Sequence, residues 1–121
     1  MPSFKQSVSF ALNGLKLVLK EKHIRVHLVC MCLVTFAGLY FHISQTEWLV
    51  CFLLFGLVIG MEIINTAIER LVDLVSPHHN PKAGIIKDMA AGAVLFSAIM
   101  AIVCGVLIFG KYILDLLQPN H

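Results

Sequence analysis

Two long apolar segments constrain this chain more than any other feature. One runs from Met89 to Phe109 without a charged residue, and the other runs from Trp48 to Ile68 with few polar positions. A helix needs about 20 residues to cross the hydrocarbon core of a bilayer, and both segments reach that length. The chain is 59% hydrophobic and only 13% charged, far from the composition of a soluble domain. Both segments are therefore predicted to span a membrane.

The rest of the N-terminal half predicts one more span and a surface helix. His27 to Ile43 can span if its polar ends lie at the interfaces. Before it, apolar residues recur at helical spacing with lysines and small polar residues opposite them, the pattern of an amphipathic helix on a membrane surface. We expect an all-α membrane protein forming one domain over 1–121. The surface helix is expected at about 3–22, and the spans at about 27–43, 48–75 and 88–110.

The basic residues predict the orientation. Five Lys or Arg residues precede the first span and three lie around the connection between the second and third spans. The loop at 42–47 has none. The positive-inside rule then places the N-terminus and the second connection in the cytoplasm, and the C-terminus outside. The net charge of +2 gives no sign of nucleic-acid binding.

A polar stripe begins inside the second span. At about 100° per residue, Glu62, Asn65, Glu69 and Asp73 fall on one helical face. A charged group at bilayer depth is costly and usually functional. The simpler alternative is that Glu62 pairs with a cation on a neighbouring helix. That alternative leaves the other polar residues in register unexplained.

The stripe would run from the cytoplasmic surface into the membrane. Glu62 precedes Glu69 by two helical turns, which places it roughly 10 Å deeper at about 1.5 Å per residue. A catalyst that joins a water-soluble substrate to a lipid needs such an arrangement. It would handle the charged ligand at the shallow end and hold an acid–base group at the deep end.

Other groups on the cytoplasmic side extend this chemistry. Glu21 and Glu69, from separate helices, could hold a hard divalent cation through oxygen, and such an ion would neutralise phosphate charge during phosphoryl transfer. Lys87 could pair with phosphates. Glu62 could accept a proton from a lipid hydroxyl, and Asn65 could orient either group.

Each of these residues also has a structural interpretation. Glu21 would screen the basic residues around it, and Glu69 would belong to a solvated helix end. Lys87 would only follow the positive-inside rule. Asp88 is as well placed to cap the N-terminus of the third span as to act in catalysis.

Two further observations limit the prediction. His23 and His27 have the i, i+4 spacing of metal ligands but lack an acidic third ligand on the same helix, so interfacial histidines are favoured. The chain contains no phosphate-binding loop and no soluble-kinase motif. The residues alone therefore predict a membrane protein with a polar, metal-capable site at its cytoplasmic surface.

A family resemblance narrows this prediction. The residues from Glu62 to Glu69 with Val72-Asp73, followed by Lys87-Asp88-Met89-Ala90-Ala91-Gly92-Ala93-Val94, resemble the signature of the prokaryotic diacylglycerol kinase / undecaprenol kinase family. The likeness extends over nearly the whole chain, including the surface helix. It implies phosphorylation of a membrane lipid alcohol, dependent on ATP and magnesium, by a homotrimer with active sites shared between subunits.

The resemblance also implies residue roles. It makes Glu62 the catalytic base and Asn65 the motif asparagine, and it makes Glu21 and Glu69 metal ligands. The positions it associates with nucleotide, besides Glu21 and Glu69, are Lys87, Asp88, His79 and Asn80, with His78 in the same loop. Details such as Ser76-Pro77 resemble the undecaprenol branch more than the diacylglycerol branch. The alternatives from other classes are a small proton-coupled transporter and a non-catalytic membrane subunit.

Overall fold

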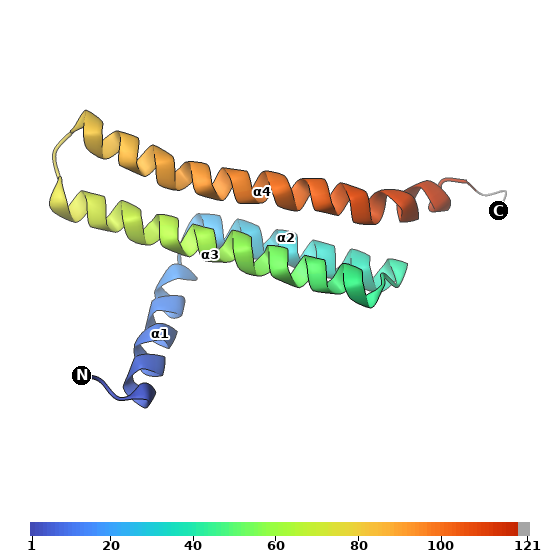
Figure 1. The fold of residues 1–121 in the computed structure, drawn as a ribbon, viewed down its shortest axis with the longest axis horizontal. Coiled ribbons are helices and arrows are strands. Elements are labelled where there is room, and N and C mark those ends of the chain that lie inside the picture. Colours follow the sequence, from blue (N-terminus) through green and yellow to red (C-terminus); the bar gives the residue numbers. More distant parts are fainter. Residues whose placement is uncertain (119–121) are drawn as a thin grey trace.

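The computed structural model describes residues 1–118 and consists of helices joined by short turns (Figure 1). The helices are α1 (Phe4–Val18), α2 (Lys22–Phe41), α3 (Gln45–Val75) and α4 (Pro81–Leu116). The last three are long and apolar enough to cross a membrane. The predicted all-α membrane fold with a short amphipathic N-terminal helix and three spans is therefore confirmed.

Capping boxes, formed by local side-chain hydrogen bonds, stabilise the N-termini of two of these helices. Ser3 and Gln6 form a capping box at α1, in which the Ser3 hydroxyl accepts from the Gln6 amide at 3.2 Å and the Gln6 side chain accepts in return at 2.9 Å. Ser44 and Glu47 do the same at α3, at 3.2 and 3.0 Å. Each box satisfies amide groups that a helix N-terminus otherwise leaves without partners.

The start of α4 corrects the alternative that Asp88 caps the third span. Asn80 is the N-cap, with its side-chain oxygen accepting from the Lys82 amide at 3.0 Å, and Pro81 is the first helical residue. Proline suits that position because its missing N–H would have no helical partner there. Asp88 therefore lies about two turns inside α4, and it is exposed.

The helix bounds differ from the predicted ones at several ends. The surface helix ends at Val18 rather than near 22, because the chain turns there and Glu21 becomes the N-cap of α2. Helix α2 ends at Phe41, where His42 takes a left-handed conformation with φ of 53°. Helices α3 and α4 begin at 45 and 81, before the residues at about 48 and 88 where the membrane spans are predicted to begin. Apolar patterns mark the membrane-length part of a helix, whereas caps mark its ends.

Helix α3 is the element that organises the bundle. It packs against both α2 and α4, more extensively against α4. The α3–α4 turn lies at one end, and the α2–α3 turn lies at the other (Figure 1). Around the α2–α3 turn, Ile43, Cys51 and Ile108 form a buried cluster flanked by aromatic side chains. Helix α1 extends away from the bundle and buries no residue.

Candidate functional site

The polar stripe on α3 passes from the interior of the bundle to its surface. Glu62 and Asn65 are buried, with 4% and 6% of their surfaces exposed. Glu69 and Asp73, one and two turns further on, are exposed. The stripe therefore runs from buried to exposed residues toward the α3–α4 turn, as the sequence predicts.

Asn65 connects the two halves of the stripe. Its side-chain amide donates to Glu69 Oε1 at 3.2 Å. Its Oδ1 is buried and has no hydrogen-bond partner within residues 1–118. A buried acceptor without a partner is costly, and such groups often mark the place of a ligand or an ordered water. The Asn65 Oδ1, between Glu62 and Glu69 in the stripe, is therefore an acceptor that a ligand or water could use.

Glu62 has a neighbour on another helix. His27 Nε2, from α2, lies 3.5 Å from Glu62 Oε2, and the two side chains are 21% and 5% exposed. Glu62 therefore does contact a basic side chain on a neighbouring helix, as the simpler alternative predicts. It does not explain Asn65 or Glu69, whose polar groups face one another rather than His27.

Glu21, a predicted metal ligand, is held by Arg70. The guanidinium Nη2 donates to Glu21 Oε1 at 2.5 Å, joining α3 to the N-cap of α2. Because Arg70 follows Glu69 in the chain, this contact brings Glu21 to the exposed end of the stripe. Both side chains are partly exposed, so solvent screens the pair.

The oxygen donors at this end fit a hard divalent cation. Magnesium binds through oxygen, commonly one or two carboxylates together with substrate phosphates, and keeps several of its waters. Glu21 and Glu69 offer carboxylates, and Asn65 offers its unpartnered Oδ1. Across residues 1–118 no group of three or more His, Cys, Asp or Glu side chains could hold a metal ion. Substrate phosphates and water would therefore have to complete the coordination.

A second group of predicted residues meets at the α3–α4 turn. His79, Asn80 and Lys87 line one polar hollow of about 240 Å³ there, together with Asp73. The Lys87 ammonium forms an ion pair with Asp73. Asp88 is not among the residues that line this hollow. The turn thus brings together three of the four predicted nucleotide residues of this region.

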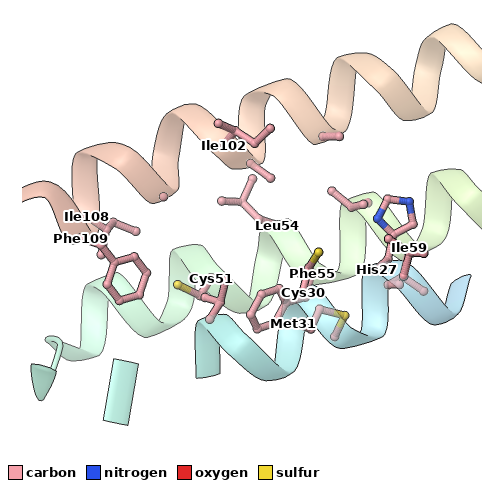
Figure 2. A pocket seen from close by; sticks show the side chains of 16 residues that line it. His27, Cys30, Met31, Cys51, Leu54, Phe55, Ile59, Ile102, Ile108 and Phe109 are labelled. Atoms are coloured by element: carbon pink, nitrogen blue, oxygen red, sulfur yellow. The ribbon is translucent and has the colours of Figure 1, made fainter. Parts of the chain in front are cut away.

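An apolar cavity of about 360 Å³ lies between α2, α3 and α4. His27 is at one end of it, and Ile108 and Phe109 are at the other (Figure 2). Since His27 also contacts Glu62, one side chain joins the apolar cavity to the buried end of the polar stripe.

Sequence reasoning did not assign His27 or Arg70 to the site. His27 had only its spacing from His23, which indicated an interfacial residue, and Arg70 counted only toward orientation. The available signal was that a buried acid inside a span needs a polar partner on an adjacent helix. Choosing that partner requires the packing of the helices.

The chain is a multi-pass membrane protein with a polar site at one end of its bundle. It has three membrane-length helices, and a buried carboxylate begins a stripe of oxygen donors that ends at an exposed turn. Comparison with known proteins identifies the family. Residues 9–109 match the family described as prokaryotic diacylglycerol kinase.

Individual relatives agree with this match. The chain is 40% identical over 89 residues to an undecaprenol kinase of Bacillus subtilis, covering 74% of this chain and 72% of that protein. It is 37% identical over 86 residues to a diacylglycerol kinase of Synechocystis, covering 70% and 49% of the two chains. A diacylglycerol kinase of Sinorhizobium is 30% identical over 89 residues, covering 74% and 65%. The chain belongs to the prokaryotic diacylglycerol kinase family and is a lipid kinase, which decides against the transporter and the non-catalytic subunit.

Proposed function

We propose that this protein transfers the γ-phosphoryl group of ATP to the hydroxyl of a membrane lipid alcohol, undecaprenol, in a magnesium-dependent reaction. The observation that carries the proposal is the buried Glu62 carboxylate, which lies between an exposed cluster of oxygen donors and an apolar cavity. Such a position suits a base that serves a lipid hydroxyl on one side and a phosphate on the other.

Glu62 acts as the general base in this proposal. Its carboxylate accepts the hydroxyl proton as the lipid oxygen attacks the γ-phosphorus and the bond to the β-phosphate oxygen breaks. Asn65 orients the reacting groups. Its amide already donates to Glu69, so its free Oδ1 is the atom available to a bound hydroxyl or water.

Glu21 and Glu69 would hold the metal. Magnesium, when bound, would neutralise charge on the phosphates. The Arg70 guanidinium pairs with Glu21 near the exposed end of the stripe, so a bound cation would compete with Arg70 for this carboxylate.

The α3–α4 turn binds the nucleotide. Lys87 leaves Asp73 to pair with the phosphates, and His79 and Asn80 contribute polar contacts from the wall of the hollow that they share with Lys87. Asp88, the next residue along α4, belongs to the same nucleotide region by the family motif.

The acceptor is proposed from the relatives. The undecaprenol kinase of Bacillus subtilis shares 40% identity with this chain, against 37% and 30% for two diacylglycerol kinases. Diacylglycerol is the alternative acceptor, with phosphatidic acid as product.

We further propose a homotrimer in the inner membrane of a bacterium, with the N-terminus and the active site on the cytoplasmic side. Subunit association would cover the polar stripe of this thin bundle, in which Glu69 and Asp73 are exposed in the single chain. The distribution of Lys and Arg supports the orientation.

Purified protein incubated in micelles with radiolabelled ATP and a panel of lipid alcohols tests the proposal. We expect label in a lipid monophosphate, more from undecaprenol than from diacylglycerol, and loss of label when magnesium is chelated. A preference for diacylglycerol would contradict the proposal that undecaprenol is the acceptor. Absence of label with every lipid would overturn the reaction.

A further inference from the structure

The contact between His27 and Glu62 joins two helices at the proposed base. We propose that His27 is a positioning residue, whose ring N–H orients the Glu62 carboxylate toward the lipid hydroxyl. This inference rests on the proposed function, because it concerns how the proposed base is held. It adds a role for a residue that neither spacing nor composition had placed in the reaction.

The partners of Glu62 support this role. Its side chain is 5% exposed, and His27 is its only hydrogen-bonding or ionic partner that we find in the described part of the chain. A carboxylate with one donor takes its orientation from that donor. The 3.5 Å separation is longer than the usual N–H···O hydrogen bond, so the two groups are in polar contact without forming one in this structure. Catalytic contacts of this kind often tighten only when substrate is bound.

The surroundings of the imidazole also direct its N–H to Glu62. His27 lines the apolar cavity (Figure 2), and no other residue in that lining carries a side-chain nitrogen. A polar group against an apolar wall costs free energy unless it is hydrogen-bonded. Since the cavity offers the ring no acceptor of comparable strength, the Glu62 carboxylate is the acceptor available to its N–H.

Helix α2 supplies a matched control. His23 lies one turn before His27 on the same helix, and it is exposed. It is not among the residues that line the cavity and has no place in the proposed site. Substitutions at His23 therefore test the effect of losing a histidine from α2 without touching Glu62.

Three variants at His27 distinguish the effect of its N–H donor from the effect of its size. His27→Gln keeps an amide N–H near the place of Nε2, His27→Asn has a donor too short to reach it, and His27→Leu fills the space without a donor. We expect kcat to fall roughly tenfold to a hundredfold in the Leu and Asn variants, the range for loss of a hydrogen bond to a charged group. The Gln variant should stay within about fivefold of wild type. The KM values for ATP and lipid should change little, and the His23 variants should match wild type.

Several outcomes would overturn the inference. Unchanged kcat in the Leu and Asn variants would do so, as would a Gln variant no better than Leu. A change confined to KM would assign His27 to binding instead. If the Leu variant does not fold in micelles, the comparison of Gln with Asn still decides.

A second substitution at the base completes the test. If His27 acts through Glu62, His27→Leu should cost less in a Glu62→Asp background than in wild type, because the shortened carboxylate has already left the contact. Equal costs in both backgrounds would contradict the role. The proposed function is tested separately by the wild-type chain in the same assay, since an inactive wild type would refute the reaction whatever the variants do.

Discussion

Arg70 on α3 donates to the Glu21 carboxylate at the N-cap of α2, with 2.5 Å between Nη2 and Oε1. The contact ties the start of one span to the end of the next. It also places a cation against a proposed metal ligand, so the two residues should differ sharply in what their removal does to metal binding.

Glu21→Gln removes a charged oxygen ligand in this scheme. We expect the magnesium concentration for half-maximal activity to rise at least tenfold, which corresponds to about 1.4 kcal/mol or more of metal affinity. Arg70→Gln should lower that concentration by at most about fivefold, because an ion pair this exposed is worth about 0–1 kcal/mol. A magnesium titration of lipid phosphorylation measures both. Identical titrations for Glu21→Gln and wild type would remove Glu21 from the metal site.

Glu62→Gln tests the proposed base. The amide keeps the shape of the side chain but cannot accept the hydroxyl proton, so kcat should fall by roughly a hundredfold or more. Nucleotide binding, measured by equilibrium dialysis with labelled ATP, should persist. The control is Glu47→Gln, at the other end of α3, which should keep its turnover. An active Glu62→Gln enzyme would exclude this residue as the base.

Lys87→Met tests the nucleotide hollow. Loss of charge-assisted contacts to phosphate should raise the KM for ATP by roughly tenfold or more, while the KM for lipid stays near its wild-type value. Lys82→Met is the control, since Lys82 is exposed near the start of the same helix. If both variants have the same KM for ATP, general attraction by positive charge explains the effect better than a specific contact.

Gly38→Ala tests the packing of α2 on α3. A Cβ at this position would lie 2.7 Å from the Trp48 ring and 3.1 Å from Ile43, both of which would have to shift. Overpacking of this kind costs about 1–3 kcal/mol. Gly14→Ala meets nothing within 4 Å, and it should be neutral or stabilising by up to about 1 kcal/mol. Detergent-induced unfolding followed by circular dichroism compares the two, and equal midpoints would contradict the close approach.

Tyr112→Phe tests the contact that joins α4 to the start of α3. The Tyr112 hydroxyl donates to Glu47 at 2.5 Å, and Lys111 lies 2.9 Å from the same carboxylate. We expect a lower unfolding midpoint with kcat unchanged, because this contact lies at the opposite end of α3 from the site. Tyr40→Phe, at an exposed tyrosine, should unfold like wild type. A fall in kcat without a change in stability would show that the two ends are coupled.

Local pattern was sufficient for much of this protein. The uncharged segment from Met89 to Phe109 predicts a membrane-spanning helix whatever its neighbours are. It is long enough to cross the bilayer, and a helix satisfies its own backbone polar groups there. The three- and four-residue steps from Glu62 to Asp73 likewise predict one polar face, because helical periodicity is a local property. The caps at Ser44 and Asn80 were not predicted, and the alternative that Asp88 caps the third span was wrong, because Asn80 and Pro81 begin α4 earlier in the chain.

The order of the residues was therefore enough to predict the spans, the polar face of α3 and the family. The contacts of His27 with Glu62 and of Arg70 with Glu21, and the hollow that His79, Asn80 and Lys87 share, depend on how the helices pack. Residues on one helix are placed by its pitch. Residues on different helices meet only where the helices cross and where turns set their relative height, and many side chains together decide that packing.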